Sequence, residues 1–170
     1  IMDALSKVAP ENVLAGAGSP IWCVNISGTH ANGAQITGLF FFNGGMGASA
    51  NSDGLSCVSW PSNISSTPAE EIEHRLPIRV IKRELRQNSG GSGKYNGGDG
   101  QLIKLEYTGA KDGILAFLAE RTKAPAKGIA GGANGALGKL EINGKNIDPK
   151  VQHVIKPGSI ITLATPGGGG

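Results

Sequence analysis

The feature that most constrains the fold of this chain is a glycine-rich stretch between two apolar segments. Residues 88–100 read NSGGSGKYNGGDG, and apolar segments flank them at 78–85 and 101–107. Glycines between two strand-like segments are typical of a chain reversal. The later segment is apolar at every second position, which predicts a strand with one buried face. The earlier segment is apolar on both faces, which predicts a strand with a bulge or one covered on both sides.

A short helix is predicted just before the first of these strands. Thr67 can act as N-cap, Pro68 suits the first helical position, and Glu70 stands three residues after the cap. This spacing is that of a capping box with proline at the first helical position. The Leu76-Pro77 pair should end the helix, because a residue that precedes proline is disfavoured in the α region.

The rest of the chain predicts further short strands and little helix. Asn143-Gly144 is the preferred pair for a type I′ turn and predicts a hairpin. Apolar spacing before Pro10 indicates a helix at the start. Further strands are expected at 21–27, 36–42, 114–120, 140–142, 145–147 and 160–164. Residues 1–170 therefore predict a single β-rich α+β domain, with a mixed or antiparallel sheet of seven or eight strands, two short helices and long glycine-rich loops.

Composition excludes several classes of protein. Glycine accounts for 28 of 170 residues without a collagen-like period, which indicates a folded, loop-rich chain. The net charge is only +3, and the basic residues are spread out without interleaved aromatics, so a nucleic-acid partner is not favoured. The apolar run at 36–42 is too short to span a membrane. No signal-peptide layout is visible, and Cys23 and Cys57 match no metal or redox spacing, so we expect a cytoplasmic protein with two free thiols.

Two glycine-rich loops are candidate sites. Residues 43–54 read NGGMGASANSDG, in which Ser49, Ser52 and Asp53 supply polar atoms beside accessible backbone N–H groups. The spacing fits neither a Walker A motif nor a dinucleotide-binding fingerprint. The second loop, 89–100, could form a phosphate cradle with Lys94 at its rim. For both loops, a plain strand connection is the alternative.

No catalytic residue can be assigned from spacing. His30, His74 and His153 are isolated, so a metal site made wholly within this chain is not expected. Glu70, Glu71 and Glu73, early in the predicted helix, could offer a general base, but the helix dipole favours acidic residues there in any case. The basic run Arg79, Lys82, Arg83 and Arg86 is typical of a solvated strand face.

Four motifs, taken together, resemble one family. They are GGMGA followed by DG, TPAEEIE with LPIRV, ELRQNSGGSGKYNGG, and the closing TPGGGG. In this order and spacing they resemble the C-terminal part of the hydantoinase B/oxoprolinase family. That family includes B subunits of ATP-dependent N-methylhydantoinases, the matching half of 5-oxoprolinase, and subunits of acetone and acetophenone carboxylases.

The resemblance implies a partner and cofactors outside this chain. In the family, ATP with Mg is bound by a hydantoinase A-like subunit, which phosphorylates an amide or carbonyl oxygen, and the B part then processes the activated substrate. The divalent metal and the catalytic residues belong to the N-terminal segment of the B part. The matching loop residues Gly45, Met46, Gly47 and Asp53 would line the substrate cavity, with Asp53 either bonded to the loop backbone or facing the ligand.

The chain also departs from the family pattern. The family commonly has arginine at the positions of Ser49 and Asn96, and the loss of a cation would alter substrate preference or activity. The chain begins with Ile1 and ends in glycines, which suggests a piece of something longer. Three functions stay open: part of an ATP-dependent cyclic-amide hydrolase, part of a ketone carboxylase of the acetone or acetophenone type, or a non-catalytic assembly module.

Overall fold

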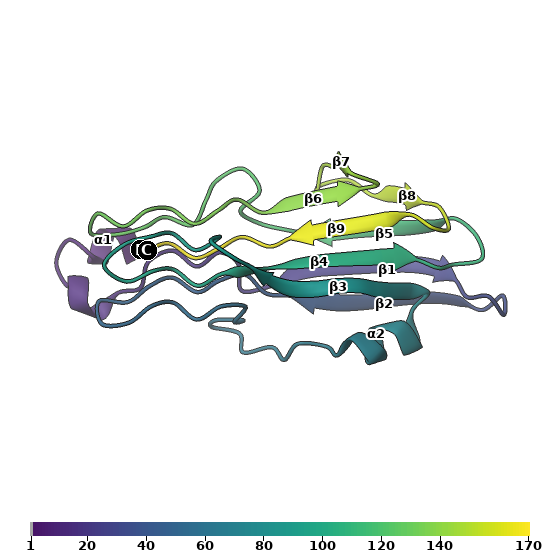
Figure 1. Cartoon of the computed structure of the whole chain (residues 1–170), viewed down its shortest axis with the longest axis horizontal. Coiled ribbons are helices and arrows are strands. Elements are labelled where there is room, and N and C mark those ends of the chain that lie inside the picture. The colour runs from purple at the N-terminus through teal and green to yellow at the C-terminus, as the bar shows by residue number, and fades with distance from the viewer. Residues whose placement is uncertain (1) are drawn as a thin grey trace.

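The computed structural model describes residues 2–170 and contains two antiparallel sheets packed face to face (Figure 1). One sheet has the strand order β2-β1-β5-β8 and the other β3-β4-β9-β6-β7. The first comprises β1 (Trp22–Thr29), β2 (Gln35–Phe42), β5 (Gly113–Leu118) and β8 (His153–Ile155). The second comprises β3 (Ile78–Arg86), β4 (Gly100–Tyr107), β6 (Lys139–Ile142), β7 (Lys145–Asn146) and β9 (Ile160–Ala164). The described helices are α1 (Met2–Leu5), α2 (Ala69–Arg75) and a 3₁₀ turn at Pro10–Asn12.

The β-rich α+β class is confirmed, but the arrangement differs from the prediction. Every strand pair is antiparallel, and the strands divide into two sheets rather than one. The three residues of β8 were not predicted, because a strand this short shows no periodicity. The helix expected at the start is only α1, four residues long. In the described chain, no helix has the length and apolar character needed to cross a membrane.

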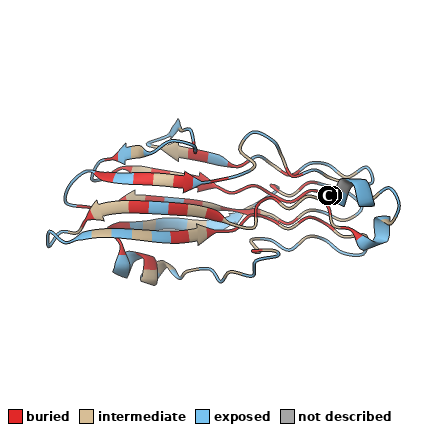
Figure 2. Cartoon of the chain, turned by 180° about the vertical axis from the view of Figure 1, so that it is seen from behind, coloured by how far each residue is buried: buried red, intermediate tan, exposed pale blue. Residues whose placement is uncertain are grey.

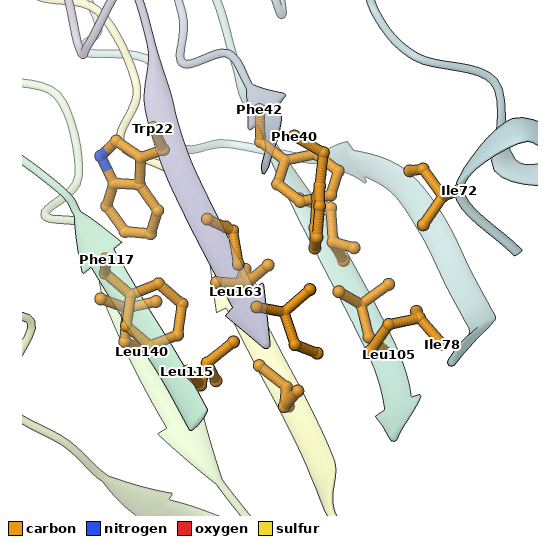
Figure 3. Packing of buried hydrophobic residues seen from close by; sticks show 14 of the residues in the cluster. Trp22, Phe40, Phe42, Ile72, Ile78, Leu105, Leu115, Phe117, Leu140 and Leu163 are labelled. Carbon is orange, nitrogen blue, oxygen red and sulfur yellow. The ribbon is translucent and has the colours of Figure 1, made fainter. Parts of the chain in front are cut away.

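The core lies between the two sheets, as Figure 3 shows. Trp22, Val24 and Ile26 point inward from β1 at every second position and are almost fully buried. The inward side chains of β4 and β9 face them, and Tyr107 on β4 is also fully buried. A Cβ at Gly28 would lie 2.5 Å from the Tyr107 hydroxyl, so this close approach of β1 and β4 requires glycine. The predicted one-sided burial of the 101–107 strand is confirmed.

Helix α2 leads into β3, and its start differs from the predicted capping box. The helix begins at Ala69 with Pro68 in the N-cap position, and no side chain caps it. The carbonyl of Thr67 instead accepts a hydrogen bond from Arg83 Nη1 over 2.7 Å, which holds this residue outside the helix. The predicted C-terminal end is confirmed, because Leu76 is the extended C-cap residue.

Strand β3 contains the predicted bulge. Its pairing with β4 shifts register between Val80 and Lys82. The backbone N–H of Val80 donates to Glu73 Oε1 over 2.7 Å, so a helix carboxylate satisfies a donor at the irregularity. Glu73, one of the acidic residues weighed as a general base, is therefore occupied in holding α2 against β3.

The Asn-Gly hairpin is confirmed in detail. Strands β6 and β7 pair across Asn143 and Gly144, whose φ angles are 51° and 76°. Positive φ at both central residues is the signature of a type I′ turn. The Asn143 side chain also accepts a hydrogen bond from the backbone N–H of Ile160 over 2.7 Å, which ties the turn to β9.

Candidate functional site

Both candidate loops belong to a bundle of extended segments beyond one end of the two sheets (Figure 1). We call this region the glycine bundle. It consists of residues 13–20, 43–58, 89–99, 124–138 and 165–170, which lie outside the named strands and are joined by backbone hydrogen bonds. The glycines that the sequence places in separate loops are thus gathered in one structure. Neither loop is a simple strand connection.

The closing TPGGGG segment forms the centre of the bundle and is buried along its whole length (Figure 2). The backbone N–H groups of its four glycines donate to three neighbouring segments. The N–H of Gly170 donates to the same segment as the N–H of Gly167. The bonds run from Gly167 to Ala136, from Gly168 to Gly98, from Gly169 to Gly16 and from Gly170 to Ala133. A three-residue period without internal hydrogen bonds is typical of the polyproline II conformation. The closing segment satisfies its backbone N–H groups through its neighbours.

Lack of space, rather than backbone conformation, explains the glycines of the bundle other than Gly131, which has a φ of 89° and open space around it. A Cβ at Gly45 would lie 1.7 Å from the carbonyl oxygen of Gly98, and one at Gly168 would lie 2.0 Å from that of Met46. Real Cβ atoms do not approach backbone oxygens so closely. Neither glycine has a positive φ, so an alanine would clash without any Ramachandran penalty.

Two carboxylates accept hydrogen bonds from backbone N–H groups of the second loop. Asp53 Oδ1 accepts a hydrogen bond from the backbone N–H of Asn96 over 2.7 Å. Asp99 Oδ1 accepts from the backbone N–H groups of Ser89 and Gly90, each over 2.8 Å. These bonds satisfy donors of segments that have no regular secondary structure. Asp53 therefore bonds the loop backbone, one of its two predicted orientations.

Two of the four basic residues on β3 also brace this region. Arg83 donates to Gln101 Oε1 and to the carbonyl of Thr67, and its guanidinium lies 5.5 Å from the ring centroid of Phe42. Arg86 donates to the carbonyls of Leu137 and Thr165. Burial lowers the pKa of both guanidinium groups. The expected solvated face is wrong for these two residues, whereas Arg79 and Lys82 are exposed.

A cavity of about 400 Å³ opens at the end of the bundle that lies away from the sheets. Its polar side chains are those of Glu11, Ser49, Lys94 and Tyr95, and the Lys94 ammonium lies 5.2 Å from the centroid of the Tyr95 ring. Small or apolar residues complete the wall, among them Pro10, Ala48, Ala50 and residues 129–132. The Lys94 ammonium, the Tyr95 phenol and the Glu11 carboxylate beside an apolar wall can bind a small polar organic molecule or an anion. The Ser49 hydroxyl is already hydrogen-bonded within its own loop.

None of the four predicted substrate-binding residues is in the wall of this cavity. Gly45, Met46 and Gly47 are packed within the bundle, and the three residues that follow them line the cavity. Asp53 is exposed and joined to the second loop. Their role in substrate binding stays a prediction. The contributions of Glu11 and residues 129–132 were missed, because neither segment carries a recognisable motif.

Two of the three histidines contact backbone carbonyls, and both thiols are free. His30 Nε2 lies 3.2 Å from the carbonyl oxygen of Arg75, and His153 Nε2 lies 2.7 Å from that of Asp148. Cys23 and Cys57 are free thiols, and burial raises the pKa of each. Among the side chains that the structure describes, no three of His, Cys, Asp or Glu are grouped so that they could hold a metal ion.

Sequence comparison decides the family. The family model described as hydantoinase B/oxoprolinase matches residues 1–170. The chain belongs to this family. Among curated relatives, 5-oxoprolinase of Dictyostelium discoideum is 35% identical over 87% of this chain and 12% of its own length. The putative B subunit of a D-/L-hydantoinase from a Pseudomonas species is 32% identical over 100% of this chain and 29% of its own length. The beta subunit of caprolactamase from Pseudomonas jessenii is 30% identical over 98% and 31%.

Solved structures agree with this membership of the hydantoinase B/oxoprolinase family. The ATP-dependent caprolactamase from Pseudomonas jessenii is 26% identical, with a TM-score of 0.73 over 97% of this chain and 31% of that one. Nucleotide-free acetone carboxylase has a TM-score of 0.72 over 98% of this chain and 27% of that one, and at 18% identity it shows the shared fold alone. The present chain spans less than a third of the length of each of these relatives.

Proposed function

We propose that residues 1–170 are the C-terminal portion of a B-type subunit of an ATP-dependent cyclic-amide hydrolase of the hydantoinase or 5-oxoprolinase type. The observation that carries this proposal is the match, over nearly the whole chain, to a hydantoinase B subunit and to a caprolactamase beta subunit at 32% and 30% identity. The names of these relatives and of 5-oxoprolinase point to one bond, the amide within a ring. The substrate class we propose is therefore a lactam or hydantoin.

The chemistry requires a partner. An unactivated ring amide is a poor electrophile, and phosphorylation of its oxygen creates a good leaving group. We assign this step to a hydantoinase A-like subunit that binds ATP with Mg, and ring opening to the B-type subunit. The divalent metal would lie in the N-terminal segment of the same B-type polypeptide, since the described residues of this chain gather no set of three metal ligands.

In this proposal the present chain shapes the substrate cavity. The glycine bundle is a rigid support because its backbone groups bond one another and its glycines let the segments approach closely. It holds the first loop, with Gly45, Met46, Gly47 and Asp53, against the second loop. At the end of the bundle, the Lys94 ammonium would face an anionic phosphorylated intermediate.

A ketone carboxylase is the second candidate, supported by the similarity of the fold to acetone carboxylase. That similarity comes with 18% identity, whereas caprolactamase is 26% identical in the structural comparison, which favours the hydrolase. A third candidate is a non-catalytic assembly module. It is supported by the predominance of structural roles among the polar residues of the bundle.

The deciding experiment uses the complete protein that contains these residues, co-expressed with its A-type subunit. ATP consumption and ring opening are followed with 5-oxoproline, hydantoin and caprolactam, and controls omit ATP or the A-type subunit. We expect ring opening of at least one cyclic amide that requires both. Consumption of acetone or acetophenone that requires bicarbonate, with no ring opening, would establish the carboxylase instead.

The place of the cavity is tested separately with the Lys94→Ala variant of the same enzyme. We expect its kcat and kcat/KM for the cyclic amide to fall about tenfold with little change in KM and unchanged stability, because the proposed contact is made with the anionic intermediate and not with the neutral substrate. An ammonium that pairs with an anion contributes on the order of 1–2 kcal/mol. Lys145→Ala on the exposed strand β7 is the matched control and should leave both kinetic constants unchanged. If Lys94→Ala and Lys145→Ala had the same kinetic constants, the cavity would not be part of the substrate site.

A further inference from the structure

The outer face of the β2-β1-β5-β8 sheet exposes large apolar side chains to solvent. Leu118 is 70% exposed, Val154 69%, Leu39 53% and Ile114 46%. The strand register makes these positions neighbours, since Leu118 lies opposite Cys23, Leu39 opposite Asn25 and Ile114 opposite Val154. We call this surface the apolar face. It comprises Cys23, Asn25, Ser27, Thr37, Leu39, Phe41, Ile114, Ala116, Leu118 and Val154.

The apolar face carries no charge, unlike the outer face of the other sheet. The sequences of β1, β2, β5 and β8 contain no Asp, Glu, Lys or Arg. On the other sheet, Arg79 pairs with Glu106 across β3 and β4, and Lys139 pairs with Glu141 on β6. An antiparallel sheet with one solvated face normally alternates apolar and polar residues. The second sheet follows this pattern, and the first presents apolar groups on both sides.

An uncharged sheet face of this kind indicates a permanent interface. Charged residues are depleted in the buried centre of interfaces, and obligate interfaces are more apolar than exchangeable ones. Contiguous apolar surface on a soluble protein also marks interaction sites or aggregation hazards. A partner that binds this face must therefore be apolar itself and must rarely dissociate.

We propose that the apolar face is covered by the remaining part of the same B-type polypeptide. The chain spans 29% of the hydantoinase B subunit and 31% of the caprolactamase beta subunit, so most of such a polypeptide lies outside the 170 residues. A segment of the same polypeptide never dissociates, which suits an uncharged face. The A-type subunit is a separate molecule that must be soluble before assembly, so an extensive apolar surface that matches this face is less suited to it. The proposal depends on family membership and not on the hydrolase activity.

The test measures how well position 118 is shielded in the complete B-type subunit. Leu118→Cys places a thiol on the apolar face, and Leu85→Cys places one on the other sheet, where Leu85 is 53% exposed. Iodoacetamide labelling of each thiol, followed by peptide mass spectrometry, is compared with labelling of the same thiol in the urea-unfolded protein. In the purified B-type subunit alone, we expect labelling at 118 to be at least about tenfold slower than at 85, because alkylation requires an accessible thiolate.

The other occupants give different results, and each would overturn the proposal. Protection that appears only after the A-type subunit is added would assign the face to that subunit. Protection that rises with the concentration of the B-type subunit would assign it to a second copy, and fast labelling under all conditions would leave the face uncovered. As a second measurement, Leu118→Lys should lower the Tm of the complete subunit by at least about 3 °C, whereas Leu85→Lys should leave it unchanged.

Discussion

Asp53 accepts a hydrogen bond from the backbone N–H of Asn96 over 2.7 Å, and this bond joins the two glycine-rich loops of the bundle. The residues are 43 positions apart, so the contact is a tertiary one and not a local turn. The backbone N–H of Gly54, the next residue, in turn donates to the carbonyl of Asn96. A side chain and a backbone group therefore fix the same point of the second loop.

Replacing Asp53 separates its structural role from a role toward a ligand. Asp53→Ala should lower the free energy of unfolding by about 1 kcal/mol, since one hydrogen bond at an exposed site is lost. Asp53→Asn keeps the Oδ1 acceptor and should restore most of that stability in urea unfolding. Wild-type stability combined with a large loss of ring-opening activity in Asp53→Asn would show that the carboxylate also acts on the ligand.

Glycine at position 45 is required by the space available. Gly45→Ala should destabilise the protein by at least about 3 kcal/mol, because the new methyl group would overlap the carbonyl oxygen of Gly98 and only a backbone shift could relieve the clash. The free energy of unfolding, measured in urea, gives the size of the effect. Loss of soluble expression would be its extreme form.

A matched control uses a glycine that is required for conformation alone. Gly33 has a φ of 85° with open space around it. Gly33→Asn should cost less than about 1 kcal/mol, because asparagine tolerates the left-handed region. If Gly45→Ala were as mild as Gly33→Asn, the close packing of the bundle would be contradicted.

Features that depend on local chemistry were predictable from the sequence. Asn143-Gly144 specified its hairpin, alternation identified strands such as β4, and Leu76-Pro77 marked the end of α2. Their determinants lie within a few residues of one another. The start of α2 was misjudged for the opposite reason, because Arg83, a residue on β3, holds the Thr67 carbonyl.

The glycine bundle could not be predicted from the same rules. Its segments carry no periodicity, and glycine leaves no side-chain pattern from which a partner could be inferred. The bond between Gly168 and Gly98 joins backbone groups 70 positions apart, and nothing in either local sequence selects the other. The motifs suggested a family and a site, but only the fold shows that the closing glycines form its centre.

Arg83 should contribute more to stability than Arg79 on the same strand. Arg83 bonds Gln101 and the Thr67 carbonyl in a partly buried position, so Arg83→Lys should cost about 2 kcal/mol in urea unfolding as the planar fork of donors is lost. Arg79 pairs with Glu106 with an exposed side chain, and Arg79→Lys should cost less than about 0.5 kcal/mol. Equal costs would show that the contacts of Arg83 add nothing beyond its charge.

Cys57 should resist alkylation at neutral pH. Burial raises the pKa of its thiol to about 11, the Asp99 carboxylate adds to this effect, and the Arg83 charge opposes it. The thiolate is the reactive form, so the iodoacetamide labelling rate of Cys57 should stay low at pH 8 and climb as the pH approaches 11. A labelling rate that levels off at pH 9 would contradict the raised pKa.

The same shift predicts a loss of stability at alkaline pH. The unfolded chain releases the Cys57 proton near its ordinary pKa of about 9, whereas the folded protein keeps it until about pH 11. Because the folded state binds more protons in this window, the free energy of unfolding should fall as the pH rises from 9 to 11. Cys57→Ser removes this thiol and should make this part of the stability profile less steep, whereas the Cys23 thiol, whose pKa burial also raises, keeps its own contribution. An unchanged slope in that variant would assign the alkaline loss to other groups.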